Sequence, residues 1–85
     1  MKWPAASTEI LDKMIRAKPD MFRKKAEAEI RKRAEEICRA AGLEEITPRI
    51  LAEANYAVTP EEFRPFVEID LNKMGFNSTV FKRKQ

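Results

Sequence analysis

Residues 19–57 read PDMFRKKAEAEIRKRAEEICRAAGLEEITPRILAEANYA, and this stretch decides the fold. Between residues 20 and 41, apolar residues recur at steps of three or four, which is the spacing of one face of an α-helix. Gly42 then supplies the left-handed residue that commonly ends a helix. After a short turn, Thr47 is a good N-cap and Pro48 suits a first helical position. The stretch therefore predicts a long amphipathic helix, a tight turn and a second helix.

The two faces of the long helix differ sharply in polarity. Its apolar stripe consists of Phe22, Ala26, Ile30, Ala34, Ile37, Cys38 and Ala41. Its charged face offers five i, i+4 ion pairs, each contributing about 0.2–0.5 kcal/mol: Lys25–Glu29, Glu27–Arg31, Glu29–Arg33, Arg31–Glu35 and Lys32–Glu36. The second helix is expected at 48–56. We expect one dry interior to be shared by Phe22, Ile30, Ile37, Ile50 and Leu51.

A short helix is expected before the long one, at residues 8–17. Ser7 or Thr8 can cap its N-terminus. It ends at Lys18, because a residue that precedes a proline disfavours the helical conformation. Its apolar stripe consists of Ile10, Leu11, Met14 and Ile15.

A fourth helical segment is expected after Thr59, which can cap it as Thr47 caps the third. Pro65 would break a continuous helix, so we expect a first turn at 60–64 followed by a kink or a restart. Gly75 ends the segment, and residues 76–85 are expected to form a mobile tail. The residues at helical spacing are Phe63, Phe66, Val67 and Leu71.

The expected fold is all-α: a small orthogonal bundle of three to four helices with a mobile C-terminal tail. An 85-residue chain is expected to form one domain. The expected internal boundary lies at Val58–Thr59, and it separates a helical unit at 1–58 from an additional helix and basic tail at 59–85.

Charge is distributed unevenly along the chain. The 17 basic and 14 acidic residues give a net charge of +3, which equals the charge of residues 82–84 alone. Residues 1–41 carry 11 basic and 7 acidic side chains, whereas residues 42–81 carry 3 and 7. A basic half beside an acidic half favours association or self-association. It argues against nucleic-acid binding, which requires a continuous basic surface.

The sequence offers little for catalysis. It contains no histidine, the commonest general base and metal ligand. Cys38 is the only cysteine, so no internal disulfide can form, and its place on the apolar stripe predicts a small buried hydrophobe. We therefore predict no catalytic, cofactor-binding or metal-binding residue. No apolar run is long enough for a membrane span, and a cytoplasmic location is expected.

One short region is a candidate for binding a partner. Three cations at 23–25 oppose the positive end of the helix dipole, where an anion or an acidic surface can bind. The alternative is a solvated face that Asp20 and Glu27 relieve. The methionines could likewise form an adaptable surface or simply fill the core. The candidate partner-binding residues are Met14, Met21, Phe22, Arg23, Lys24 and Lys25.

Residues 3–57, about two thirds of the chain, resemble the small C-terminal domain of the B subunit of light-independent protochlorophyllide reductase. The pattern is a tryptophan and a short helix, then a proline, an aromatic residue and an arginine before a long helix, a glycine and an Ile-Thr restart. The matching residues are Trp3, Leu11, Pro19, Phe22, Arg23, Ala26, Ile30, Glu35, Gly42, Ile46, Thr47, Ile50, Leu51 and Ala54.

The resemblance implies an accessory or docking module rather than an enzyme. In that nitrogenase-like family, a porphyrin double bond is reduced with electrons from iron–sulfur clusters and ATP hydrolysis. The cluster ligands and the catalytic acid belong to large domains outside the matched span, and the C-terminal domain helps to cover the substrate pocket. A large iron–sulfur reductase subunit is the partner that the resemblance implies. A tetrapyrrole-facing role would involve Met14, Met21 and Phe22.

Two functions from different classes remain open at this stage. The first is a non-catalytic protein-interaction module related to this reductase domain. The second is a small nucleic-acid-associated helical protein that uses residues 23–25 and the basic residues 82–84. The neutral body of the chain disfavours the second. The oligomeric state is not determined by the sequence.

Overall fold

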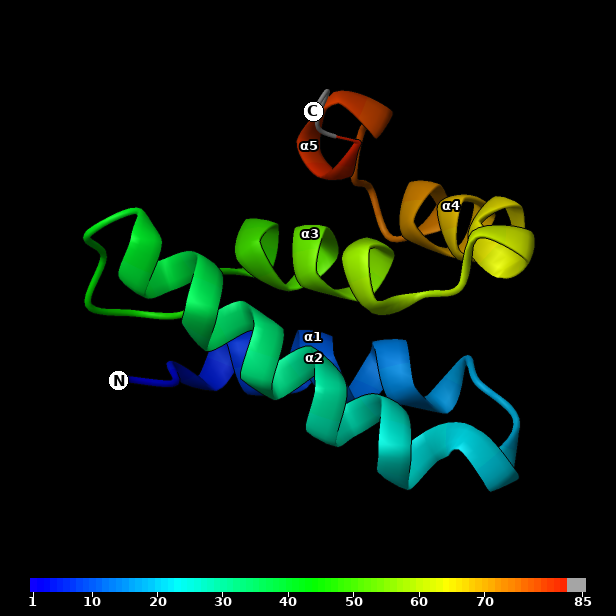
Figure 1. The fold of residues 1–85 in the computed structure, drawn as a ribbon, viewed down its shortest axis with the longest axis horizontal. Helices are drawn as coiled ribbons and strands as arrows, with labels where there is room; N and C mark the ends of the chain where they lie inside the picture. Colours follow the sequence, from blue (N-terminus) through cyan, green and yellow to red (C-terminus); the bar gives the residue numbers. More distant parts are fainter. Residues whose placement is uncertain (83–85) are drawn as a thin grey trace.

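The computed structural model describes residues 1–82 and shows a small all-α bundle, which confirms the expected fold class (Figure 1). Helix α3 is central, because it contacts all four of the other α-helices described. Helices α1 and α2 lie on one side of α3, and α4 and α5 lie on the other (Figure 1). The elements are α1 (Ala5–Arg16), α2 (Asp20–Ala40), α3 (Pro48–Val58), the 3₁₀ turn η1 (Glu61–Phe63), α4 (Arg64–Lys73) and α5 (Ser78–Phe81).

The core forms where α2 and α3 meet. Ile30, Ala34 and Cys38 lie one turn apart on α2 and are fully buried. Ile50 and Leu51 of α3 are buried against them, as expected. The complete core consists of Leu11, Met14, Ile15, Ile30, Ala34, Cys38, Ile46, Ile50, Leu51, Ala52, Ala54, Val67, Leu71 and Phe81.

The expectation for Phe22 is wrong. Its side chain is 53% exposed, whereas Ile37 is half-buried against the core. The fully buried residues of α2 begin only at Ile30, and before it the half-buried Ala26 packs against the core but Phe22, in the first turn, does not. Helical spacing gives the direction of a side chain, but burial also requires a neighbouring element at that height along the helix.

Glycines end both α2 and α4. Gly42 and Gly75 have φ angles of 70° and 96°, in the left-handed region that favours glycine. At the first of them, the N–H groups of Gly42 and Leu43 donate to the carbonyls of Arg39 (3.1 Å) and Cys38 (2.9 Å). This is the Schellman arrangement, and the same two bonds close α4. The predicted C-terminal caps are therefore confirmed.

The N-terminal segment is tied to the α2–α3 loop. Helix α1 begins at Ala5, three residues earlier than expected, and Ser7 does not cap it. Instead, the buried Ser7 hydroxyl donates a hydrogen bond of 2.5 Å to the carbonyl of Ile46. The backbone of Lys2 bonds to Glu44 (3.1 Å) and Ile46 (2.9 Å). These bonds hold α1 beside the start of α3.

Trp3 packs back on the bundle. Its indole N–H donates to Glu35 at 3.1 Å, and the Arg31 guanidinium lies 4.8 Å from the ring centroid. Arg31 also pairs with Glu27 at 3.1 Å, one of the five expected pairs. Glu35 is thereby used by the indole rather than by Arg31. Trp3 thus anchors the N-terminus on α2.

The connection from α3 to α4 shows the expected restart. The 3₁₀ turn is followed at Arg64 by α4, whose first turn contains Pro65. Thr59 does not cap this segment, because its hydroxyl donates to the Asn55 carbonyl at 2.6 Å. The interruption lets the chain turn and places α4 beside α3 (Figure 1).

The expected mobile tail is corrected for residues 76–82. Residues 78–81 form α5, and Phe81 is only 2% exposed. The Phe81 ring lies 5.1 Å from the ring of Tyr56, and Lys82 pairs with Glu68 at 2.9 Å. The sequence analysis missed this helix because it did not expect Phe81 to be buried, and a buried aromatic residue contributes enough apolar contact to hold a short helix on the core. The Lys82 ammonium lowers the pKa of the Glu68 carboxyl below its ordinary value.

The division at Val58–Thr59 stays a prediction, although both parts contribute side chains to one core. Val67, Leu71 and Phe81 from the second part cluster with Leu51 from the first. Residues 83–85 of the expected basic tail lie outside the described residues.

Replacing Ser7 by alanine should lower the free energy of unfolding by about 1–3 kcal/mol, because it leaves a buried carbonyl without a donor. Urea denaturation measures the effect. Thr8→Ala is the matched control, since Thr8 is exposed and its hydroxyl bond is long at 3.4 Å. Equal effects of the two substitutions would contradict the role assigned to Ser7.

Replacing Phe81 by alanine should cost about 3–5 kcal/mol, the usual loss for a buried phenylalanine. In dilute solution, the same substitution at the exposed Phe63 should change stability by no more than about 0.5 kcal/mol. Thermal or urea unfolding compares the two variants. A small effect of Phe81→Ala would mean that α5 is not docked on the core.

Candidate functional site

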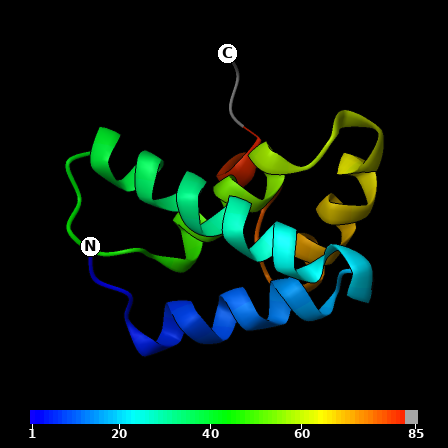
Figure 2. The same cartoon turned by 60° about the horizontal axis from the view of Figure 1, so that its bottom comes forward.

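An apolar groove opens at one end of the bundle, and we call it the aromatic groove. It has a volume of about 540 Å³ and lies between the α1–α2 turn and α4. Figures 1 and 2 both place these two segments at the same end, away from the α2–α3 loop. The lining residues are Ala17, Lys18, Pro19, Phe22, Lys25, Ala26 and Glu29 on one wall, and Val58, Thr59, Pro60, Phe63, Phe66, Val67 and Asp70 on the other.

Large apolar side chains are exposed in and beside this groove. Phe22 and Phe66 line it and are 53% and 65% exposed, and Phe63 on the second wall is also exposed. Met21 precedes Phe22 and is 81% exposed, and Ile69 lies one turn after Phe66 on α4. Such a concentration of exposed apolar residues is typical of a surface that binds another molecule.

Helix α4 supplies most of this surface because it carries two apolar stripes. Val67 and Leu71 face the core and are buried. Phe66 and Ile69 point in other directions around the same helix and stay in solvent. The sequence therefore contains more apolar residues on this helix than its core contact uses. This excess is the signal by which the second wall of the groove could have been found.

Arg23 fixes the α1–α2 turn that forms the first wall. Its Nε donates to the carbonyl of Lys18 at 2.9 Å, and Nη2 donates to that of Arg16 at 3.0 Å. The last carbonyls of a helix have no donor within that helix, so a guanidinium satisfies them well. Arg23 also pairs with Asp20 at 2.5 Å. These contacts give Arg23 a structural role in the turn.

Charges of both signs line the groove: Lys18, Lys25 and Glu29 on the first wall, and Asp70 on the second. Lys24 and Lys25 are exposed on α2, and Glu61 and Glu62 are exposed beside Phe63. Within the part of the chain that the structure describes, none of these four side chains forms an ion pair. Of these four residues, only Lys25 lines the groove itself.

Lys18 and Asp70 face each other across the groove. Partial burial lowers the pKa of the Lys18 ammonium below its ordinary 10.5, and the nearby Asp70 carboxylate opposes this shift. The folded-state pKa is below the unfolded one, so the charged form opposes folding. The contribution of Lys18 to the free energy of unfolding therefore rises as the pH increases from its lowered folded-state pKa to its unfolded-state pKa of about 10.5.

The structure separates the candidate partner-binding residues. Met14 is 2% exposed in the core, so a partner cannot reach it without unfolding α1. Met21, Phe22 and Lys25 lie in or beside the aromatic groove. Lys24 is exposed next to them. Core filling, the alternative for the methionines, thus applies to Met14 and fails for Met21.

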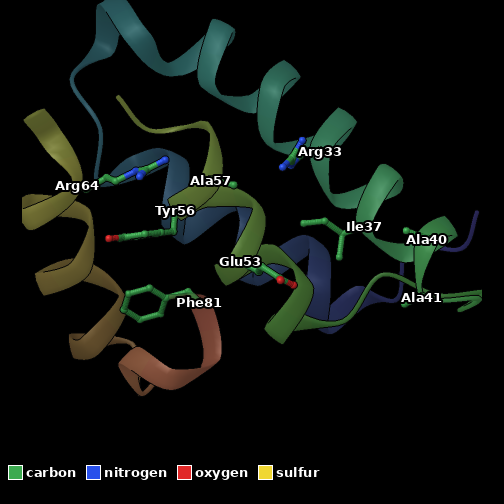
Figure 3. A pocket seen from close by; sticks show the side chains of 9 residues that line it. All are labelled: Arg33, Ile37, Ala40, Ala41, Glu53, Tyr56, Ala57, Arg64 and Phe81. Carbon is green, nitrogen blue, oxygen red and sulfur yellow. The ribbon is translucent and has the colours of Figure 1, made fainter. Parts of the chain in front are cut away.

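A second hollow of about 620 Å³, the polar pocket, lies between α2, α3 and α5 (Figure 3). Arg33 lines it from α2, and Glu53 and Tyr56 line it from α3. The Arg64 guanidinium lies 5.0 Å from the centroid of the Tyr56 ring, which also contacts the Phe81 ring at an interplanar angle of 45°. These contacts hold α4 and α5 against α3. The residues that line the polar pocket therefore contribute to the packing of the helices.

Cys38 has no exposed surface, as expected, and its thiol lies 3.3 and 3.2 Å from the carbonyls of Leu43 and Glu45. In residues 1–82, no three cysteine or acidic side chains lie close enough together to hold a metal ion. No helix in the same range is both long and apolar enough to cross a membrane.

Replacing Asp70 by asparagine should lower the pKa of Lys18 further, because it removes the charge that opposes the effect of burial. A ¹³C NMR titration of the lysine Cε groups measures the titration midpoint of Lys18 in the wild type and in Asp70→Asn. The wild-type midpoint of Lys18 should lie below 10.5. An unchanged or raised midpoint in Asp70→Asn would contradict the contact across the groove.

Comparisons with models of known protein families, with curated proteins and with solved structures find no match to this chain. None of them links it to protochlorophyllide reductase, so the resemblance of residues 3–57 stays a prediction. The aromatic groove is the feature of this chain from which a function can be inferred.

Proposed function

We propose that this chain is a non-catalytic protein-interaction module that binds its partner through the aromatic groove. The exposed apolar side chains around the groove are the observation that carries the proposal. A protein surface suits such a groove, because aromatic and methionine side chains are enriched in the buried centres of protein interfaces. Placing Phe22, Phe63 and Phe66 against a partner removes them from water, and this supplies the driving force.

Nucleic-acid binding receives less support from the same residues. Arg23 bonds to Asp20 and to the end of α1, and Lys82 pairs with Glu68. Arg83 and Lys84 lie outside the described residues. Lys24 and Lys25 make a small basic area, beside an apolar groove that is also lined by the acidic Glu29 and Asp70.

The resemblance to the reductase domain extends this proposal to a class of partner. A large iron–sulfur subunit of a nitrogenase-like reductase is the proposed partner in the cell, in a cytoplasmic setting. The single cysteine, buried and without a disulfide partner in the sequence, suits a reducing compartment. Of the residues proposed to face a tetrapyrrole, Phe22 lines the groove, Met21 lies beside it and Met14 is buried.

A paired pull-down from the native host tests the module. The full chain is compared with Phe66→Asp, which places a charge in the groove, and with Leu43→Asp, which alters an exposed apolar residue in the α2–α3 loop. Recovery of a defined partner should fall at least about tenfold with the first variant and be retained with the second. Mass spectrometry identifies the partner.

Two results would contradict this proposal. Equal recovery with both variants would show that the groove is not the binding surface. Recovery of only ribosomal or chromosomal material, lost as salt is raised, would favour the nucleic-acid alternative.

A further inference from the structure

We propose that Lys18 is a covalent binding site for aromatic aldehydes, which its side-chain amine takes up as an imine inside the aromatic groove. The proposal concerns the chemistry of one side chain and does not rest on the protein-interaction function. It is carried by the position of this amine, which the fold holds half-buried in an apolar hollow.

The backbone fixes Lys18 firmly between α1 and α2. Its N–H donates to the carbonyl of Ile15 at 3.0 Å, and its own carbonyl accepts the 2.9 Å bond from Arg23 Nε. Pro19 follows directly and restricts the backbone of Lys18 to extended conformations. The side chain therefore leaves a rigid turn, and it lines the groove.

The surroundings of the Lys18 side chain do not favour a charged group. Phe22, Phe66 and Val67 line the same groove. Lys18 forms no ion pair with any residue between 1 and 82. The ammonium thus loses part of its hydration without gaining a close carboxylate in return, and such a loss disfavours the charged form.

The charge state of Lys18 follows from this position. Burial lowers the pKa of its ammonium, and the Asp70 carboxylate across the groove opposes the shift. The other charged residues that line the groove are Lys25 and Glu29. A desolvated lysine holds a larger share of neutral amine near neutral pH, and the neutral amine is the nucleophile. The environment that destabilises the ammonium therefore makes the nitrogen reactive.

The reaction with an aldehyde needs no further reagent. The neutral nitrogen of Lys18 attacks the carbonyl carbon, and a C–N bond forms. The carbonyl oxygen then leaves as water together with the two amine hydrogens, which gives the imine without oxidation or reduction. When the imine nitrogen takes up a proton from solvent, the Asp70 carboxylate faces the positive charge from across the groove.

The lining of the groove selects the rest of the ligand. Phe22, Phe63 and Phe66 all line it, and aromatic rings pair favourably in offset or edge-to-face arrangements. The volume of about 540 Å³ lies within the usual range for pockets that hold small molecules. An uncharged aromatic ring next to the aldehyde therefore suits this site.

Benzaldehyde tests the site on the full chain near neutral pH, with cyanoborohydride to trap the imine and tandem mass spectrometry to locate it. Lys18 should react at least about threefold faster than Lys25, an exposed lysine that lines the same groove. Lys18→Arg should lower the total early adduct at least about threefold, and the matched control Lys25→Arg should not. Equal rates at Lys18 and Lys25 in the wild type would overturn the proposal.

A second pair of variants tests the groove itself. Phe66→Asp places a carboxylate in the groove and removes an aromatic ring, so it should slow the reaction of Lys18 at least about threefold. Leu43→Asp, in the distant α2–α3 loop, should leave the rate unchanged. Circular dichroism checks that all variants are folded. A rate at Lys18 that Phe66→Asp does not lower would overturn the site, whereas the pull-down tests the protein-interaction function independently.

Discussion

Helix α3 packs against a stripe of small side chains on α2, and the positions of the other helices follow from this contact. Ala34 and Cys38 on α2 and Ala54 on α3 are fully buried, so the two backbones approach closely. Because α3 contacts each of the other α-helices described, its seat on α2 fixes where they can bind. Small residues make this close approach possible, because a larger side chain at these positions would push the two helices apart.

The same contact explains why apolar surface remains at one end. The fully buried part of α2 begins at Ile30, and the first turn of this helix, with Met21 and Phe22, extends beyond the core. Helix α4 contacts α3 through Val67 and Leu71, which leaves its other apolar stripe in solvent. An 85-residue chain has little interior to offer, and some of its apolar residues must remain at the surface. Here they are gathered in one place.

The groove combines features that favour recognition with features that hold its shape. Arg23 secures the α1–α2 turn by satisfying the last carbonyls of α1, and Pro65 fixes the start of α4. Both walls are therefore positioned before any partner binds, which lowers the entropic cost of association. The charged side chains that line the groove, among them Lys25 and Glu29, add orientation rather than driving force, since exposed ion pairs contribute little to stability.

The sequence by itself determined the helices, their caps and most of the core. These features depend on local spacing and on single residues such as Gly42, Thr47 and Pro48, so they can be recognised without knowing any neighbour. The burial of Ile30, Ile50 and Leu51 followed from the same periodicity. For the candidate site, the sequence analysis named residues 21–25, and two of them, Phe22 and Lys25, line one wall of the groove.

Only the tertiary structure decided which apolar faces are covered. Periodicity alone gave the wrong burial for Phe22 and missed the docking of Phe81, because covering a side chain requires a partner element that lies far away in the sequence. The second wall was missed for the same reason: Phe63 and Phe66 look like core residues until α4 is placed. Arg23 stays a candidate binding residue, and its structural role was missed, since the carbonyls that it satisfies meet it only when α1 and α2 fold together.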